Sequence, residues 1–311
     1  MAAATFSGLA SAHLPPGPVH LAIGMFDGVH QGHRAVIEPA VLAAGASRGT
    51  PAVLTFWPHP STLFRPDNPT RLILPPGIKA DLLSELGIRV VISEPFTREL
   101  AALPADDFLP WLKRQVPALA AVYVGENFRF GQRRAGDVAL LERVGAAMGL
   151  AVVSAPRVSA GGELVSSTRI RAHLAAGEIE AANALLGYSY FSAGPAQTGK
   201  RLGRTIGFPT LNQHWSPDLR PALGVYGVRV RGTKAPTALA GVANYGLRPT
   251  VENATEPKLE IHVLGACPYD AGDELKVEWL KFLRPERKFA SLEALRAQIA
   301  ADRAAAERFF G

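Results

Sequence analysis

The sequence predicts an α/β fold in which a parallel, doubly wound sheet is followed by a small antiparallel β-barrel with a C-terminal helix. In residues 1–187, short apolar runs alternate with segments of helical periodicity, which is typical of parallel sheets. In residues 188–311, Gly and Pro become dense and helical periodicity is absent until Ser291, which indicates short strands joined by turns. We therefore expect two domains, comprising residues 1–187 and 188–311.

The composition supports two folded domains and excludes several classes of protein. A chain of 311 residues with 48% hydrophobic residues is long and apolar enough for two cores. No apolar run reaches membrane-spanning length, and the first eighteen residues lack the basic and apolar regions of a secretory signal. Cys267 is the only cysteine, so no internal disulfide forms and a reducing cytoplasm is expected.

The net charge of +6 comes mainly from the second predicted domain. Residues 188–311 hold 17 Lys and Arg against 12 Asp and Glu, whereas residues 1–187 hold 16 against 15. A basic excess favours phosphate-bearing ligands, and nucleic acid is the rival partner.

The predicted elements of the first domain follow a proline-containing segment, residues 1–18, that we expect to be a loose leader. Residues 19–23 predict a strand, and a glycine-bracketed turn leads to a helix that Pro39 should kink or shorten. The remaining patterns predict strands at 52–56, 90–92, 121–124 and 151–153, and helices at 78–86, 106–116, 138–148 and from Ser166 onward.

The predicted elements of the second domain are mostly strands. Alternating or apolar patterns predict them at 224–230, 239–243, 259–263 and 275–280. Ser291 is a suitable cap for a final helix that presents Leu292, Leu295 and Ile299 on one face.

Polar motifs follow three strands of the first domain, at residues 24–33, 57–60 and 125–134. Ligands of parallel sheets bind beyond the carboxyl ends of the strands. The motifs therefore predict one nucleotide pocket at this edge, to which the Ser-Ser-Thr-Arg stretch at 166–169 adds further polar groups.

Within the first motif, His30 and His33 fall at the start of the predicted helix. A helix N-terminus attracts phosphate, and two imidazoles there can donate hydrogen bonds to a phosphoryl group as its charge builds up. Three alternatives are a helix cap, ordinary surface histidines and a metal site, but for the metal the His-Glu-x-x-His pattern is absent. We favour cleavage of an α–β phosphate bond, because Asp27 and a glycine turn accompany the histidines.

The second domain contains a possible phosphate site in residues 199–212. Its glycines allow backbone N–H groups to face an anion, although a basic surface turn is the alternative. Thr210 and Asn212 are two residues apart, so on an extended chain both oxygens face one side and could bind Mg²⁺. Glu260, on a predicted strand, is either a solvated residue or the base that accepts a proton from an alcohol.

Taken together, these stretches resemble the prokaryotic bifunctional riboflavin kinase/FAD synthetase family. The resemblance covers roughly residues 18–305, and six motifs occur in the family's order: 24–33, 55–60, 125–131, 166–171, 203–212 and 244–250. It implies that a Rossmann-like domain adenylylates FMN to FAD and that the barrel phosphorylates riboflavin to FMN. Both reactions use ATP and Mg²⁺, and the expected partners are small molecules rather than nucleic acid or membrane.

For the adenylyltransferase site, the resemblance implies His30 and His33 as catalytic residues. It implies that the ATP phosphates are bound by Gly24, Phe26, Asp27, His30, His33, Ser167, Thr168 and Arg169. It places His59, Asn127 and Arg129 in the flavin and nucleotide pocket.

For the kinase site, the resemblance implies Glu260 as the base on the ribityl hydroxyl and Arg284 beside the flavin. It implies that ATP is bound by Gly199, Arg201, Gly203, Arg204, Gly207, Thr210 and Asn212, with Thr210 and Asn212 holding Mg²⁺.

Three positions depart from the family's pattern. Met25 stands where Asn is frequent, Asn127 where Asp is common, and residues 264–270 replace an acidic-aromatic segment. These departures affect substrate affinity more than chemistry, and they motivate a rival in which one site has decayed. A rival from another class is an RNA-binding protein, which would need stacking aromatics on the barrel face, where aromatic residues are sparse in the sequence.

Overall fold

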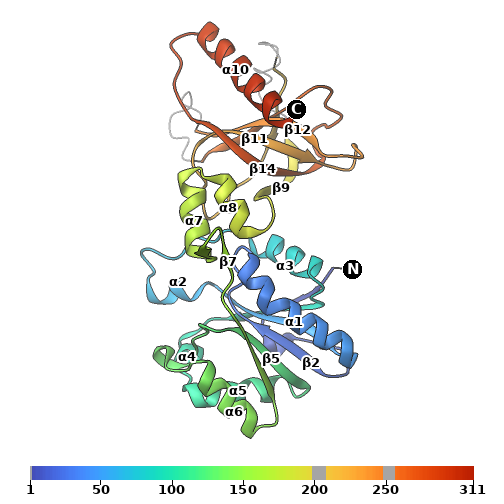
Figure 1. Ribbon diagram of the computed structural model, residues 1–311, viewed down its shortest axis with the longest axis vertical. Helices are drawn as coiled ribbons and strands as arrows, with labels where there is room; N and C mark the ends of the chain where they lie inside the picture. Colours follow the sequence, from blue (N-terminus) through green and yellow to red (C-terminus); the bar gives the residue numbers. More distant parts are fainter. Residues whose placement is uncertain (1, 198–207, 248–255) are drawn as a thin grey trace. The chain divides into compact units, whose positions relative to one another are not determined.

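The computed structural model describes residues 2–197, 208–247 and 256–311 (Figure 1). The chain divides into two compact units, Met1–Ser167 and Thr168–Gly311.

The first unit is built on a six-stranded parallel sheet whose strand order is β1-β4-β3-β2-β5-β6. Its strands are β1 (Ala4–Phe6), β2 (Val19–Ile23), β3 (Thr50–Trp57), β4 (Val90–Pro95), β5 (Leu119–Gly125) and β6 (Ala151–Ala155), with a separate hairpin of β7 (Ser159–Ala160) and β8 (Glu163–Leu164). Its helices are η1 (Leu9–Ser11), α1 (Gln31–Ser47), α2 (Pro60–Phe64), α3 (Pro76–Glu85), α4 (Arg98–Ala101), α5 (Ala105–Gln115), η2 (Gln132–Arg134) and α6 (Val138–Ala147).

Helices cover both faces of this sheet, as the doubly wound prediction requires. Leu21 and Ile23 of β2 lie in a core cluster with Phe108 of α5 and Leu141 of α6. The alternate residue Ala22 is equally buried but lies outside that cluster, on the face that α1 covers. Because side chains of a strand alternate between faces, a continuous apolar run such as β2 is buried on both.

Two expectations for the first unit are wrong. The leader is not loose throughout, because β1 pairs in parallel with β4, with Ala4 opposite Val90. A three-residue edge strand is too short to produce a recognisable pattern. Pro39 does not shorten α1, which runs over 17 residues, whereas the expected kink at this residue stays a prediction. An internal proline costs about 3 kcal/mol, and burial of Val36, Ile37, Ala40 and Ala44 against the sheet offsets it.

The second unit is a closed antiparallel barrel whose strand order is β10-β13-β12-β11-β14-β9. The strands are β9 (Phe191–Gln197), β10 (Leu211–Gln213), β11 (Gly224–Arg231), β12 (Leu239–Gly246), β13 (Lys258–Val263) and β14 (Glu274–Pro285). The helices are α7 (Ser167–Ala176), which begins at the division between the units, α8 (Ile179–Leu186) and α10 (Leu292–Phe310). Ser291 caps α10 as predicted, accepting the N–H of Ala294 at 3.2 Å.

Aromatic side chains pack together in the second unit, which the sequence does not lead us to expect. The Trp279 ring lies within 6.0 Å of four other aromatic centroids, those of Tyr190, Trp215, Tyr226 and Tyr245. Each of the five residues is at most 8% exposed. These rings therefore form the core of the unit and are not available on its surface to stack on bases.

Candidate functional site

The three polar motifs of the first unit follow neighbouring strands. Residues 24–33 follow β2, residues 57–60 include the end of β3, and residues 125–134 begin at the end of β5. The strand order places β2 between β3 and β5, so successive strands are added on one side of β2 (β3, β4) and then on its other side (β5, β6). This is the position at which open α/β sheets bind ligands.

His30 caps the N-terminus of α1. Its Nδ1 accepts the backbone N–H of His33 at 3.2 Å. Because Nδ1 is the acceptor, a neutral His30 carries its proton on Nε2, which is then a donor. The His33 ring stacks on the His30 ring with a centroid distance of 3.5 Å. The two imidazoles therefore form one rigid pair at a helix N-terminus, as predicted.

Close packing around this pair explains the glycines and Phe26. A Cβ added at Gly24 would lie 3.1 Å from the Phe26 ring, and one at Gly32 would lie 3.2 Å from Cε1 of His30. Phe26 meets the His33 ring edge-on with a centroid distance of 5.4 Å, and is only 1% exposed. Phe26 thus packs against His33 as a buried residue, and its expected contact with ATP stays a prediction.

Asp27 is buried, and its carboxylate accepts the backbone N–H groups of Ile73 at 3.0 Å and Leu74 at 3.4 Å. Its backbone carbonyl accepts the Ser167 hydroxyl at 2.9 Å. The structure thus brings two predicted motifs, residues 24–33 and 166–171, together at Asp27. The carboxylate organises the loop, which is a different task from binding phosphate.

Lys79, on α3, is a residue that the sequence analysis missed. Its Nζ donates to the Thr55 hydroxyl at 3.0 Å and to the Met25 carbonyl at 3.3 Å. Burial lowers the pKa of Lys79 to about 8, and the nearby Asp27 charge opposes that shift. A lysine within an ordinary helical pattern gives no sequence signal that it points inward.

In the motif after β3, residues 57–60, His59 caps α2. Nδ1 of His59 accepts the N–H of Ser61 at 3.0 Å. Aromatic side chains that we did not predict lie nearby in the chain: Trp57 is 49% exposed and Phe64 is 65% exposed. Phe64 meets Phe96 edge-on with a centroid distance of 6.0 Å.

In the motif after β5, alternate residues face opposite ways. Phe128 and Phe130 stack together and pack against the core. Asn127 and Arg129 are exposed, and Nη1 of Arg129 lies 3.4 Å from Asp137. This orientation agrees with a role for Asn127 and Arg129 in binding.

On the barrel, Asn212, Glu260 and Asn244 occupy one row across the neighbouring strands β10, β13 and β12. Residues directly opposite one another on paired strands share a face. Leu259 and Ile261, the neighbours of Glu260, are fully buried, so Glu260 lies on the outer face of the barrel. Asn244 is a further polar residue of this row to which the sequence analysis assigned no role.

Thr210 precedes β10 and is exposed, whereas Asn212 is 8% exposed. His262, two residues after Glu260, holds the segment before Thr210: its Nδ1 donates to the Pro209 carbonyl at 2.8 Å. The sequence analysis missed His262, since its contact depends on a segment 53 residues earlier in the chain.

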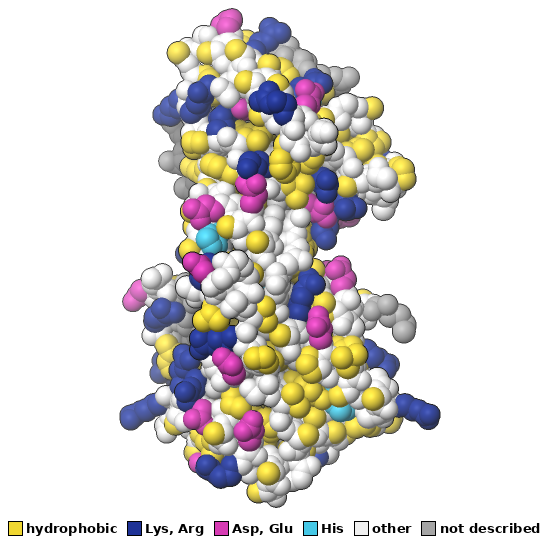
Figure 2. Space-filling view, in the orientation of Figure 1, with side chains coloured by type: hydrophobic (Ala, Val, Ile, Leu, Met, Phe, Trp, Pro, Cys, Tyr) yellow, Lys and Arg dark blue, Asp and Glu magenta, His cyan; other side chains and the backbone are white. Residues whose placement is uncertain are grey.

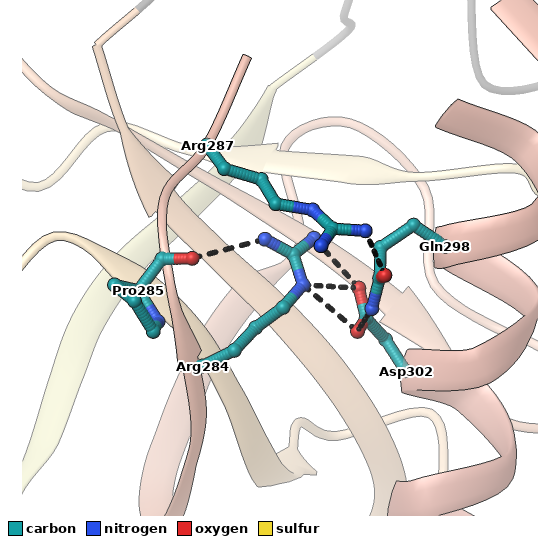
Figure 3. A network of polar contacts seen from close by, with 5 residues as sticks. All are labelled: Arg284, Pro285, Arg287, Gln298 and Asp302. Carbon is teal, nitrogen blue, oxygen red and sulfur yellow. Dashed lines mark hydrogen bonds and ion pairs between the residues drawn. The ribbon is translucent and has the colours of Figure 1, made fainter. Parts of the chain in front are cut away.

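Arg284 anchors α10 to the barrel (Figure 3). Its Nε and Nη2 donate to the Asp302 carboxylate at 2.9 Å and 2.8 Å, and Gln298 donates to the same carboxylate at 2.6 Å. Arg287 in turn donates to Gln298. The guanidinium of Arg284 is thus engaged with α10, and its contact with flavin stays a prediction.

Five predicted ATP-binding residues of the kinase site lie outside the described residues: Gly199, Arg201, Gly203, Arg204 and Gly207. In the part of the chain that the structure describes, no cluster of three or more His, Cys, Asp or Glu residues could hold a metal ion. The expected binding of Mg²⁺ by Thr210 and Asn212 stays a prediction.

Family comparisons match both units. The model of the FAD synthetase family matches residues 15–169, and that of the riboflavin kinase family matches residues 186–310. Within residues 2–197, 208–247 and 256–311, no helix is long and apolar enough to cross a membrane.

Similar proteins share nearly the whole chain. The bifunctional riboflavin kinase/FMN adenylyltransferase of Escherichia coli K12 is 39% identical over 94% of this chain and 92% of its own length. That of Bacillus subtilis is 34% identical over 93% and 92%. A crystal structure described as a macrolide-efflux protein from Streptococcus pneumoniae superposes with a TM-score of 0.85 at 25% identity, covering 99% of both chains.

Proposed function

Because this chain belongs to the family of bifunctional riboflavin kinase/FMN adenylyltransferases, we propose that its two reactions take place at two separate sites, one around His30 and His33 and the other around Glu260. The enzyme phosphorylates riboflavin with ATP to give FMN, and it adenylylates FMN with ATP to give FAD and pyrophosphate. The proposed functional domains are residues 1–187 and 188–311.

In adenylyl transfer, a phosphate oxygen of FMN attacks the α-phosphorus of ATP. The bond from that phosphorus to the bridging oxygen breaks, and pyrophosphate leaves with the electron pair. Charge builds up on the phosphoryl oxygens in the transition state, where fixed donors stabilise it. The observation that carries this assignment is the cap made by His30: because Nδ1 accepts the N–H of His33, a neutral ring carries its proton on Nε2, at a helix N-terminus that itself attracts phosphate.

Other residues of the proposed adenylyltransferase domain, residues 1–187, bind the substrates in this proposal. Ser167, Thr168 and Arg169 contact the ATP phosphates, while His59, Asn127 and Arg129 line the pocket. The exposed rings of Trp57 and Phe64 supply a flat apolar surface for the isoalloxazine ring of FMN, because offset stacking of aromatic rings is favourable.

In the kinase reaction, Glu260 accepts the proton of the ribityl hydroxyl as its oxygen attacks the γ-phosphorus of ATP and ADP leaves. The register supports this role, because Asn212 and Asn244 lie on either side of Glu260. Thr210 and Asn212 supply hard oxygen ligands suited to Mg²⁺, which when bound offsets the charge of the phosphates.

The proposed partners are small molecules, and the proposed compartment is the cytoplasm. Five aromatic rings of the second unit are buried in its core, so these rings cannot stack on the bases of single-stranded nucleic acid. On the face that Figure 2 shows, Lys and Arg side chains are interspersed with Asp and Glu side chains.

Two substitutions test the assignment of the two sites. His33→Ala removes a phosphate donor, and we expect it to lower kcat of FMN adenylylation about 10²- to 10³-fold. Glu260→Gln removes the base, and we expect it to lower kcat of riboflavin phosphorylation about 10²- to 10⁴-fold. Chromatography of products from riboflavin or FMN with ATP and Mg²⁺ measures both.

Each variant serves as the control for the other, because each should retain the reaction of the unaltered site at the wild-type rate. Loss of both reactions in either correctly folded variant would contradict the two-site proposal.

A further inference from the structure

The turn between β2 and α1 carries backbone strain at two residues. Phe26 has φ of 48° and Val29 has φ of 39°. Positive φ is unfavourable for residues with bulky or branched side chains, and it persists only where the surrounding structure enforces it. Both side chains are 1% exposed, so burial supplies part of that enforcement.

Polar contacts on the Met25 carbonyl also help to hold the turn in its strained conformation. This carbonyl accepts the Thr55 hydroxyl at 3.0 Å and the Lys79 ammonium at 3.3 Å. The ammonium also donates to the Thr55 oxygen at 3.0 Å, which closes a triangle of three polar groups. The three come from three separate segments: the turn, β3 and α3.

Lys79 is unusual because it is a charged residue that is only 8% exposed. A buried ammonium is costly unless neighbouring groups compensate it. Asp27 provides a negative charge nearby, and the Met25 carbonyl and Thr55 hydroxyl accept hydrogen bonds. All three compensating groups adjoin or form the turn that leads to His30, so the charge and the turn are coupled.

We infer that Lys79 is a positioning residue for adenylyl transfer, because its ammonium holds the strained turn that sets the His30–His33 pair in place. The inference rests on the proposed role of this pair. Lys79 does not touch the reacting atoms. It acts through Met25 and Asp27, and its loss lets the turn relax and displaces the imidazoles.

The pH dependence gives a readout that a merely structural residue would not supply. Burial lowers the pKa of Lys79 to about 8. The charged group that faces it is Asp27, and its other polar neighbours are Thr55 of β3 and the Met25 carbonyl. The ammonium is therefore present below about pH 8 and lost above it, so adenylylation should fall as the pH rises through this value.

The experiment compares kcat/KM for FMN adenylylation from pH 6.5 to 9.5 in the wild type, Lys79→Met and Lys79→Arg. We expect Lys79→Met to lower kcat/KM about 100-fold, since a small displacement of catalytic groups has an effect of that size. This variant should also lack the decline near pH 8. Lys79→Arg keeps a charge that does not titrate in this range. At pH 9 this variant should therefore retain a larger fraction of its own maximal kcat/KM than the wild type does.

Two controls separate this effect from general damage. Lys113→Met removes another ammonium that donates to a backbone carbonyl, that of Leu119 at 2.7 Å, and should leave adenylylation within about twofold of wild type. Riboflavin phosphorylation by each Lys79 variant should likewise be unchanged. Parallel loss of both reactions would show that Lys79 supports folding only, and would overturn the inference.

His33→Ala distinguishes failure of the inference from failure of the site assignment. If His33→Ala spares adenylylation, the assignment of the site is wrong. If His33→Ala abolishes it while Lys79→Met retains both wild-type activity and the alkaline decline, only the role of Lys79 is wrong.

Discussion

His20 is a buried histidine with a different task from His30. Its Nδ1 lies 2.9 Å from the Tyr123 hydroxyl and its Nε2 lies 2.8 Å from the Ser47 hydroxyl. The Ser47 hydroxyl donates to the Ala43 carbonyl at 2.9 Å, so it accepts from Nε2–H of His20, and Nδ1 accepts from Tyr123. Protonation of Nδ1 would break this chain of hydrogen bonds, and burial lowers the pKa of His20.

We predict that the free energy of unfolding of the first unit falls as the pH is lowered below about 6.5, the ordinary pKa of histidine. In that range the unfolded state binds a proton at His20 that the folded state does not, so stability rises with pH at up to about 1.4 kcal/mol per pH unit. Urea unfolding at pH 7.5 and 5.5 measures the change, and the loss of FMN adenylylation is used to monitor unfolding.

The control compares two histidine variants. His20→Gln should reduce the difference between the two pH values, whereas His214→Gln, at an exposed position, should preserve it. An undiminished pH dependence in His20→Gln would show that other groups cause it.

At the scale of elements, α10 depends on one buried ion pair. Asp302 is 6% exposed, and its carboxylate accepts hydrogen bonds from both Arg284 and Gln298. Such a pair adds little compared with apolar packing, but removing one partner leaves a buried charge uncompensated. The Arg284 end of the pair lies on β14 opposite Val225 of β11, so it connects α10 to the barrel wall.

We predict that Asp302→Ala destabilises the second unit by about 3–5 kcal/mol, because it leaves the Arg284 guanidinium without its carboxylate. Urea unfolding monitored by tryptophan fluorescence measures the effect, since Trp215 and Trp279 lie in this unit and are buried.

Glu307→Ala on the same helix is the matched control. It removes the surface pair of Arg303 and Glu307 at 2.8 Å, which should cost only about 0.3–0.5 kcal/mol. Equal destabilisation by the two substitutions would contradict the importance of the Arg284–Asp302 pair.

At the scale of the whole molecule, the chain forms two compact units. The FAD synthetase family matches mainly the first unit, and the riboflavin kinase family matches residues of the second. If each unit holds a complete site, the two reactions need not occur on the same chain. FMN released by one molecule can then serve as substrate for another.

We predict that a mixture of His33→Ala and Glu260→Gln forms FAD from riboflavin, ATP and Mg²⁺ much faster than either variant does alone. FAD should appear after a lag during which FMN accumulates, and the lag should shorten as the concentration of Glu260→Gln is raised. Chromatography over time measures FMN and FAD. Absence of FAD, when each variant retains its own reaction, would show that the sites depend on each other within one chain.

The sequence by itself determined the features that have a local physical cause. Apolar runs predicted β2 and β5, periodicity predicted α3 and α6, and Ser291 predicted the start of α10, because strand burial, helical faces and caps depend on neighbours in the chain. The glycine-bracketed turn likewise indicated that His30 and His33 stand at a helix N-terminus.

Only the tertiary structure decided which distant groups meet. Lys79 points at the Met25 carbonyl, His262 holds Pro209, and Arg284 binds Asp302 rather than remaining available. It also decided that Pro39 is tolerated within α1. The reason is that such contacts depend on packing between segments far apart in the chain, and the free energy of burial outweighs the local preferences that a sequence pattern records.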